Sequence, residues 1–524
     1  MVTEDQSAVI DFLALPSTHG GAKVERLDTH SAIVFLAGDR AYKLKRAVRF
    51  DYLDFSTAEK RRASCEGEVR LNRRMAPTIY RGVVAVTRAP DGAFELGGTG
   101  TIADWLVEMK RFPQEALLDR LAASGDLALE LMPPLADAIA IFHAGAERRT
   151  DHGGKAGMQW VVDGNAGGFL EYGAACLERS ACDRVIGDTC HELERQAALL
   201  DARRRSGFVR QCHGDLHLRN IVLLDGRPAL FDGVEFNDEI GCTDVYYDLA
   251  FLLMDLWRRQ LPRHANVVMN RYLSDTGDAD GLSLLPLFLS CRAAVRAKTS
   301  ATAAQLQSDD GQRKDLQSLA RQYLGMAGEL LRPPRPSLIA IGGFSGSGKS
   351  TLAVNLAPQV GAVPGAVVLR SDELRKRLSG VSPLDRLDAR GYSPLLNERV
   401  YTGLADSAAR ILRSGHSAIV DAVFARAADR RVIERVATLA SVSFAGLWLD
   451  APESTLVARA ERRRNDPSDA DAAVIRTQLS QDTGRIDWQQ IDASGAAPAV
   501  AERALAYLQL HFPQSTNGVS LALA

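Results

Sequence analysis

The sequence predicts two domains of different fold class: an α+β domain over residues 1–330 and an α/β domain with a parallel sheet over residues 337–515. Three observations support this. The chain has 524 residues, and this length is too great for a single hydrophobic core. Its hydrophobic content of 46% is ample for more than one core. Residues 331–336 include three prolines, which favour an extended linker. An apolar run, a Gly-rich turn and a helical pattern follow the linker, as in a parallel α/β sheet. Residues 516–524 are expected to be a loose tail.

Composition and charge predict a soluble cytoplasmic protein with no membrane partner. The net charge of −2 lacks the basicity of nucleic-acid coat or membrane-surface proteins. The seven cysteines form no C-x-x-C pair, so reduced thiols are expected rather than disulfides or a zinc ribbon. The first residues lack a basic start followed by an apolar run, and no apolar stretch approaches bilayer length.

The segment GFSGSGKS at residues 343–350 fits the pattern G-x-x-x-x-G-K-S between a predicted strand and a predicted helix. Glycines let backbone N–H groups point at phosphate oxygens, and the helix N-terminus adds its dipole. We expect Lys349 to reach the β- and γ-phosphates of ATP and Ser350 to offer its hydroxyl to Mg²⁺. The other expected phosphate-binding residues are Gly343, Ser345, Gly346, Ser347, Gly348 and Thr351.

A second strand is expected before Asp372, at the strand end where ligands gather in α/β sheets. Asp372 would accept the proton of an acceptor hydroxyl, and Arg375, one turn further, would hold that substrate. The alternative is that Asp372 only caps the helix that follows.

A third strand is expected to end at Asp421, either as the acid on the Mg²⁺ side or as a turn residue. Further along, Arg459 and Arg463 are four residues apart and share one helix face. They could close on the transferring phosphoryl group as part of a lid, or lie on a solvated face.

Residues 337 to about 512 resemble the small P-loop kinases that phosphorylate metabolites: gluconate kinase, adenylyl-sulfate kinase, chloramphenicol phosphotransferase and the zeta-toxin group. The resemblance implies an α/β P-loop NTPase fold with a parallel sheet and a lid. It also implies that Asp372 is the base and that Arg459, Arg463 and the segment DPSDA at 466–470 belong to a lid over ATP.

In the N-terminal half, HGDLHLRN places Asp215 five residues before Asn220. Two apolar runs around Asp225-Gly226 then predict a hairpin, whose pairing sets Asn220 beside Phe231. Asp232 would emerge next to Asn220, so that these two side chains could hold Mg²⁺ while Asp215 orients or deprotonates the acceptor hydroxyl. The alternative is a loop with capping acids and a surface hairpin.

Another hairpin is predicted over SAIVFLAGDRAYKLKR, and it places Lys43 where a kinase lysine meets the phosphates. Lys45 points to the same face and is the competing choice. The next segment has helical spacing, and its Glu68 is the expected ion-pair partner, with Glu66 as the second choice.

Residues 25 to about 300 resemble the aminoglycoside phosphotransferase and choline kinase branch of the protein-kinase-like fold. The resemblance implies that Asp248, in DVYYDLAFLLMDL, steadies the catalytic loop. There is no G-x-G-x-x-G near LDTHSA, and no acidic aminoglycoside-binding segment matches after Asp248, so antibiotic resistance is not inferred. The whole architecture resembles bacterial proteins that fuse such a domain to a P-loop kinase-like domain.

The leading hypothesis is an ATP- and Mg²⁺-dependent phosphotransferase with two nucleotide sites that acts on hydroxyls of small molecules. In the first alternative, only the P-loop half turns over and the N-terminal half is a nucleotide-binding regulator. In the second, the protein is a nucleic-acid end kinase or a toxin-like kinase. Aromatic content is only 6% and no basic stripe carries interleaved aromatics, so we expect no nucleic-acid partner. The sequence leaves the acceptor and the oligomeric state open.

Overall fold

The structure is a computed structural model and describes residues 2–50, 52–382, 385–462 and 468–513. Contacts between Cα atoms divide the chain into two compact units. Unit 1 comprises residues 1–168 and 190–255, and unit 2 comprises residues 169–189 and 256–524. Residues 256–330 therefore fall in the same unit as the P-loop segment, whereas the boundary at residue 330 comes from the sequence pattern and stays a prediction.

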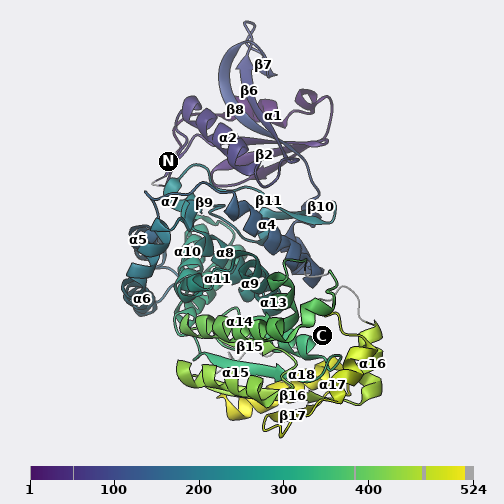
Figure 1. Ribbon diagram of the computed structural model, residues 1–524. Coiled ribbons are helices and arrows are strands. Elements are labelled where there is room, and N and C mark those ends of the chain that lie inside the picture. The colour runs from purple at the N-terminus through teal and green to yellow at the C-terminus, as the bar shows by residue number, and fades with distance from the viewer. Residues whose placement is uncertain (1, 51, 383–384, 463–467, 514–524) are drawn as a thin grey trace. The chain divides into compact units, whose positions relative to one another are not determined.

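Unit 1 contains a six-stranded antiparallel sheet in the order β1-β2-β3-β8-β6-β7. Figure 1 labels its strands β2, β6, β7 and β8. The predicted hairpin of β2 and β3 is confirmed, with Val34 opposite Lys43. Its turn needs Gly38, whose φ of 58° is in the left-handed region that favours glycine. The strands are β1 (Val24–Asp28), β2 (Ala32–Ala37), β3 (Arg40–Lys45), β6 (Tyr80–Arg88), β7 (Phe94–Leu96) and β8 (Thr101–Lys110).

Helix α2 (Ala58–Asn72) packs on this sheet and begins after Thr57, whose hydroxyl accepts the N–H of Lys60 at 3.4 Å. Its apolar residues Cys65 and Val69 join a core that includes Val107 of β8. This packing buries Glu68, which lies on the same helix face, against the sheet.

The second predicted hairpin is also confirmed. Strand β10 (Ile221–Leu224) pairs with β11 (Arg227–Leu230), and the N–H of Phe231 donates to the carbonyl of Asn220 at 3.0 Å. Asp225 and Gly226 form the turn with φ of 48° and 76°, as expected for an Asp-Gly turn. The register places Asn220 beside Phe231, directly before Asp232.

The first 258 residues also contain two short strand pairs and, within the described chain, seven α-helices besides α2. The strands are β4 (Arg49–Phe50), β5 (Leu53–Asp54), β9 (Val209–Gln211) and β12 (Cys242–Asp244). The helices are α1 (Ser7–Ala14), α3 (Leu118–Ser124), α4 (Met132–Ala144), α5 (Gly154–Tyr172), α6 (Arg179–Arg205), α7 (Asp238–Gly241) and α8 (Val245–Arg258). Helices α5, α6 and α8 contribute residues to both units.

Unit 2 is built on a five-stranded parallel sheet in the order β14-β15-β13-β16-β17. Its strands are mostly apolar because both faces are covered by helices. They are β13 (Ser337–Gly342), β14 (Val367–Arg370), β15 (Ala418–Asp421), β16 (Ser443–Asp450) and β17 (Gln489–Asp492). The parallel sheet agrees with the α/β fold that the sequence predicts for this half.

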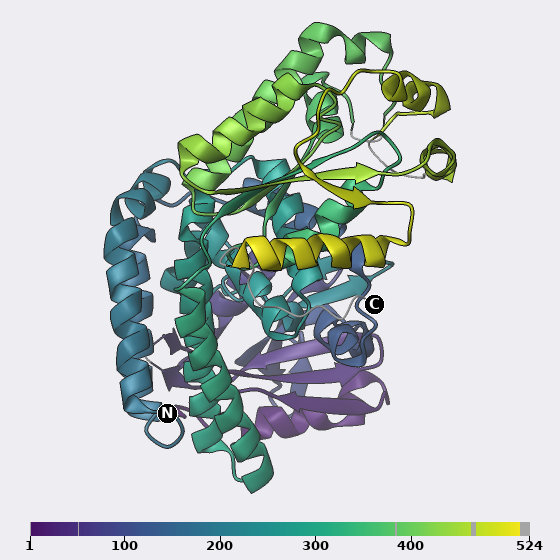
Figure 2. The same ribbon diagram turned by 90° about the horizontal axis from the view of Figure 1, so that it is seen from below.

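Helices α12 and α18 pack on one face of this sheet around a core that includes Ile339, Leu356 and Ala504. Helices α14 and α15 cover the other face, and Figure 2 shows α18 in yellow on the side opposite the green helices. The helices are α12 (Lys349–Leu356), α13 (Ser371–Leu378), α14 (Pro394–Arg413), α15 (Ala427–Ala440), α16 (Glu453–Arg462), α17 (Ala472–Leu479) and α18 (Ala497–His511).

Three further helices complete unit 2 before the sheet begins. They are α9 (Pro262–Thr276), α10 (Leu285–Leu306) and α11 (Asp310–Leu330). Helices α10 and α11 form a hairpin, and α9 lies against β14. None of the helices in the described ranges combines the length and apolar character needed to cross a membrane.

Candidate functional site

In unit 1, Lys43 and Lys45 of β3 both pair with Glu68 of α2. The Nζ of Lys43 donates to Oε1 of Glu68 at 2.9 Å, and the Nζ of Lys45 donates to Oε2 at 2.6 Å. Glu66, the second choice from the sequence, is exposed and pairs with Arg62. The structure therefore brings together the predicted Lys43–Glu68 pair and adds Lys45 to it.

Burial would raise the pKa of Glu68, but the ammonium groups of Lys43 and Lys45 outweigh burial and hold that pKa at about 2. Burial would likewise lower the pKa of Lys43, but Asp232 and Glu68 keep that pKa well above its usual value. Both side chains are thus held in their charged forms.

Asp232 follows the β10–β11 hairpin and contacts Lys43, with Oδ1 and Nζ 2.5 Å apart. Its φ of 61° is in the left-handed region, a strained conformation for a non-glycine residue. The hydroxyl of Tyr80 accepts the N–H of Asp232 at 3.0 Å, and Oδ1 of Asn72 accepts the N–H of Gly233 at 2.8 Å. These bonds fix the backbone that aims the Asp232 carboxylate.

The loop at residues 213–220 places Asp215 and Asn220 in contact. The Nδ2 of Asn220 donates to Oδ2 of Asp215 at 2.9 Å, and the Nε2 of His213 donates to the carbonyl of Phe231 at 2.8 Å. The amide nitrogen of Asn220 is engaged by Asp215, so its Oδ1 is the atom suited to a cation. Asn220 Oδ1 and the half-exposed carboxylate of Asp232 fit the oxygen ligands that Mg²⁺ prefers.

Asp248 of α8 anchors this loop from below. Its Oδ1 accepts the N–H of Gly214 at 2.8 Å, and its Oδ2 accepts the N–H of His213 and the Nε2 of His143, both at 3.1 Å. His143, Cys212 and Asp248 have ligand atoms within 4.8 Å of one another. Because the Asp248 oxygens already accept these bonds, hydrogen bonding accounts for this buried cluster.

In unit 2, the loop between β13 and α12 has the backbone expected of a phosphate cradle. Gly343, Gly346 and Gly348 have φ of 135°, 83° and 93°. A Cβ at Gly343 would lie 2.6 Å from the carbonyl oxygen of Leu449, whereas a Cβ at Gly348 would meet open space. The loop is therefore packed closely below and open above, which fits a phosphate group.

The other predicted residues of the loop lie around this cradle. The N–H of Ser345 donates to Oε1 of Gln478 at 2.8 Å, and the Nζ of Lys349 donates to the carbonyl of Phe344 at 3.1 Å. The hydroxyl of Ser347 is buried without a hydrogen-bond partner among the described residues. Thr351 lies exposed in the first turn of α12. The unpaired buried hydroxyl of Ser347 fits a site that binds a polar group.

Ser350 and Asp421 meet at the carboxyl ends of the strands. The hydroxyl of Ser350 donates to Oδ2 of Asp421 at 2.5 Å, and the guanidinium of Arg370 lies 3.6 Å from the same oxygen.

Asp372 is the second residue of α13 and does not cap it, since the N-cap position is Arg370. Burial, followed by the charge of Asp421, raises the pKa of Asp372. A carboxylate with a raised pKa suits proton acceptance.

Arg375 lies buried beside the loop at residues 387–392. Its Nη1 donates to the carbonyl of Gly391 at 3.0 Å, and its guanidinium lies 4.9 Å from the ring centre of Tyr392. The neighbouring Lys376 contacts Oδ1 of Asp469 at 3.1 Å, and the Tyr392 hydroxyl donates to the same carboxylate at 3.0 Å. Arg375 therefore holds this loop in the structure, and its contact with a substrate stays a prediction.

Of the two expected lid arginines, only Arg459 lies within the described residues, and Arg463 lies outside them. Arg459 donates to the carbonyls of Ala493 at 2.7 Å and Gly495 at 2.8 Å, just after β17. Part of the DPSDA segment, residues 466 and 467, also lies outside the described chain. The lid role of both arginines stays a prediction.

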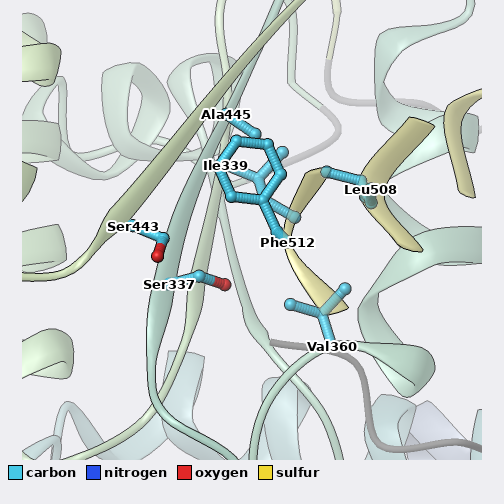
Figure 3. Close-up of a pocket in the computed structure, with 7 residues that line it drawn as sticks. All are labelled: Ser337, Ile339, Val360, Ser443, Ala445, Leu508 and Phe512. Carbon is cyan, nitrogen blue, oxygen red and sulfur yellow. The ribbon is translucent and has the colours of Figure 1, made fainter. Parts of the chain in front are cut away.

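Figure 3 shows a small, mainly apolar hollow. It lies where strand β13 begins, whereas the P-loop follows the end of that strand. It is lined by Ser337 and Ser443, which begin β13 and β16, and by Ile339, Val360, Ala445, Leu508 and Phe512. Ligands of parallel α/β sheets bind at the carboxyl ends of the strands. The hollow is therefore a packing feature, and the site lies at the loop after β13.

The sequence reasoning missed Glu235, which the structure adds to the cluster in unit 1. Its Oε1 lies 2.5 Å from the Nζ of Lys45 and accepts the hydroxyl of Ser64 at the same distance. Burial raises the pKa of Glu235, with Lys45 opposing it. The only sequence signal was a carboxylate three residues after Asp232.

Both halves of the chain match known families. Residues 34–284 match the Phosphotransferase enzyme family, and residues 338–482 match an AAA domain. The uncharacterized protein Rv2004c of Mycobacterium tuberculosis is 31% identical over 482 residues, which cover 88% of this chain and 91% of Rv2004c. Mb2027c of Mycobacterium bovis matches with the same figures. The predicted pairing of a phosphotransferase-like domain with a P-loop domain is thus confirmed.

Two solved structures are also similar to parts of the chain. A choline/ethanolamine kinase family protein from Mesorhizobium loti is 12% identical, covers 62% of this chain and 99% of its own, and has a TM-score of 0.37. A gluconokinase from Sinorhizobium meliloti is 21% identical, covers 34% of this chain and 94% of its own, and has a TM-score of 0.25.

Proposed function

Because this chain belongs to the family of the mycobacterial protein Rv2004c and joins a Phosphotransferase enzyme family domain to an AAA domain, we propose that it is an ATP-dependent phosphotransferase with two separate nucleotide sites. Each site would transfer the γ-phosphate of ATP to a hydroxyl of a small molecule. The domains support phosphotransfer and ATP use, while the acceptor hydroxyl and the two-site arrangement are the proposal.

At the N-terminal site, the ammonium of Lys43, held by Glu68, would bind the nucleotide phosphates. Oδ1 of Asn220 and the carboxylate of Asp232 would hold Mg²⁺. Asp215 would receive the proton of the acceptor hydroxyl at Oδ1 or Oδ2, and the amide of Asn220 orients that carboxylate. ATP with Mg²⁺ supplies the activated phosphoryl group; the chain supplies position and charge.

At the C-terminal site, the backbone N–H groups of the P-loop and Lys349 would bind the phosphates. The Ser350 hydroxyl and the Asp421 carboxylate would hold Mg²⁺, which agrees with their contact at 2.5 Å. Asp372 would accept the acceptor proton, and Arg375 would lie beside that substrate. Arg459 and Arg463 would exclude water from the phosphates as part of a lid.

One observation supports the two-site proposal more than any other. Each unit by itself contains a lysine that we propose to bind phosphate, two side chains suited to a metal, and a further carboxylate suited to accept a proton. In unit 1 these are Lys43, Asn220, Asp232 and Asp215; in unit 2 they are Lys349, Ser350, Asp421 and Asp372. A binding module would need the lysine and the metal ligands but no carboxylate for the proton.

The test is Mg²⁺-dependent transfer of labelled γ-phosphate from ATP into a pooled extract of small metabolites. The wild-type chain is compared with Asp215→Ala and Asp372→Ala. We expect each variant to lose a different labelled product, because each carboxylate serves one site. If Asp215→Ala changes no product while Asp372→Ala removes them all, the N-terminal half is a regulator and the two-site proposal fails. Labelling of added oligonucleotides instead of metabolites would favour the nucleic-acid end kinase.

A further inference from the structure

Five charged side chains in unit 1 form an unbroken chain of four contacts. Asp232 contacts Lys43, Lys43 contacts Glu68, Glu68 contacts Lys45, and Lys45 contacts Glu235. Asp232 and Glu235 belong to the same loop, three residues apart. The chain of contacts therefore starts and ends on the loop that carries the proposed metal ligand.

The two lysines differ in their surroundings. The side chains of Lys45 and Glu235 are 3% and 5% exposed, whereas those of Lys43 and Asp232 are 15% and 43% exposed. Lys45–Glu235 is thus an inner pair and Lys43–Asp232 an outer pair. Glu68 joins the two, because Oε1 contacts the outer lysine and Oε2 the inner one. The outer pair, being the more exposed, is the one that we expect to meet a nucleotide.

The inner pair is held from three elements. The Ser64 hydroxyl, one turn before Glu68 on α2, donates to Oε1 of Glu235 at 2.5 Å. A Cβ at Gly67 would lie 3.4 Å from Cγ of Glu235, so the helix passes close to this side chain. The ammonium of Lys45 lies 5.1 Å from the ring centre of Phe55. Strand β3, helix α2 and the Asp232 loop therefore meet at Glu235.

We propose that Lys45 and Glu235 are positioning residues for the N-terminal site, an inference that rests on the proposed function. A phosphate bound by Lys43 would compete with Asp232 for the ammonium, which already contacts both Glu68 and Asp232. Glu68 then keeps its second oxygen on Lys45, and Lys45 keeps Glu235, so the helix and the loop stay in register while the outer pair changes partners. A buried ion pair adds little net stability over apolar residues of similar size, so its main effect would be on geometry.

The reactivity of each lysine toward an acyl-phosphate derivative of ATP tests this directly. This probe acylates a lysine amine that lies beside the bound phosphates, and mass spectrometry identifies the modified residue. In the full-length wild-type chain we expect ATP-protectable acylation of Lys43 and Lys349 and none of Lys45. Acylation of Lys45 in place of Lys43 would overturn the assignment of inner and outer pairs.

The informative variant is Lys45→Met combined with Glu235→Leu, which removes both charges of the inner pair together. Glu68 keeps the contact of its Oε1 with Lys43, while its Oε2 loses Lys45. Acylation of Lys43 should fall about ten-fold, as happens when a residue that orients the groups of a binding site is lost. Acylation of Lys349 should stay at the wild-type level. Glu66→Gln, an exposed change on the same helix, is the matched control and should leave Lys43 acylation unchanged.

Hydrogen exchange of the α2 amides separates positioning from folding. Unchanged protection of α2 with reduced acylation of Lys43 supports the positioning role. Loss of α2 protection in the double variant would show that the pair only maintains the fold, and unchanged acylation of Lys43 would show that it does not act on this site; either result overturns the inference. If the wild-type chain is acylated at Lys349 but at neither Lys43 nor Lys45, the two-site proposal itself fails.

Discussion

The side-chain amide of Asn270 in α9 completes the outer edge of the parallel sheet at Val368 in β14. Its Oδ1 accepts the N–H of Val368 at 2.7 Å, and its Nδ2 donates to the carbonyl of Ala366 at 3.2 Å. Asn266, one turn earlier, donates to the carbonyls of Pro364 at 3.2 Å and Ala366 at 3.1 Å. Strand β14 is an edge strand whose backbone groups need partners. Two asparagines on a helix supply them.

Replacement Asn270→Ala should loosen β14. The partly buried N–H of Val368 would lose its acceptor, which costs about 1–3 kcal/mol. We expect faster hydrogen exchange over residues 366–370 than in the wild type. Ser274→Ala, at an exposed position one turn further along α9, should leave this exchange unchanged. Equal exchange rates in the Asn270 variant and the wild type would mean that water replaces the amide without cost.

The same edge predicts different behaviour for two fragments. A fragment beginning at residue 331, the linker predicted from the sequence, lacks α9 and leaves the backbone of β14 without the two asparagines. A fragment beginning at residue 259 retains them. We expect the shorter fragment to unfold at lower urea concentration and to aggregate, because an uncovered edge strand pairs with other chains. Equal urea midpoints for the two fragments would mean that α9 does not stabilise the parallel sheet and that the folding domain begins at the linker.

Gly346 and Gly348 should respond differently to alanine. Both have positive φ, which costs a non-glycine residue about 1–2 kcal/mol. Only at Gly346 does the added Cβ collide with backbone, that of Leu456, whereas at Gly348 it meets open space. Gly346→Ala should therefore lower the urea midpoint of unit 2 more than Gly348→Ala does. The free energy of unfolding should differ between the two variants by about 1–3 kcal/mol. Measurements without nucleotide avoid the separate effect on phosphate binding.

Asp248→Asn should impair the N-terminal site specifically. An amide at this position would place N–H groups opposite the N–H of Gly214 or of His213, so one anchor of the loop is lost. We expect the product that depends on Asp215 to fall about 10–100-fold, as for other supporting partners of a site. The product that depends on Asp372 should be unaffected. Asp238→Asn, an exposed carboxylate change in the same unit, is the control and should alter neither product.

Local sequence patterns predicted the elements whose contacts are close in the chain. The Asp225-Gly226 turn determines the register of β10 and β11, so the position of Asn220 beside Phe231 followed from the sequence. The strand before Asp421 and the loop after β13 followed from apolar runs and glycines. The roles assigned to these side chains stay predictions, to be tested by the substitutions above.

Such local patterns do not predict contacts between segments that are distant in the sequence. Lys45 and Glu235 are 190 residues apart, and Asn270 and Val368 are 98 apart. Their pairing depends on how strands and helices pack, and a lone glutamate or asparagine carries no signal for it. The sequence also left Lys43 and Lys45 as competing choices, because residues two apart on a strand share a face. Only their neighbours, Asp232 and Glu235, distinguish them.

His416, two residues before β15, should make unit 2 sensitive to acid. It is 1% exposed, and burial lowers its pKa to about 4. An unfolded histidine titrates near pH 6.5, so between pH 6.5 and 4 the unfolded chain binds a proton that the folded chain does not. Stability from this residue is therefore complete above pH 6.5 and declines as the pH falls, by roughly 3 kcal/mol at pH 4.

The variant His416→Leu removes the titrating group and keeps an apolar side chain at this position. Urea unfolding of unit 2 at pH 7.5 and at pH 5, followed by hydrogen exchange in β15, should show a smaller loss of stability on acidification in the variant than in the wild type. His511→Leu, on the exposed part of α18, serves as the matched control and should preserve the wild-type pH dependence. An identical loss in wild type and His416→Leu would assign the acid sensitivity of this unit to its carboxylates.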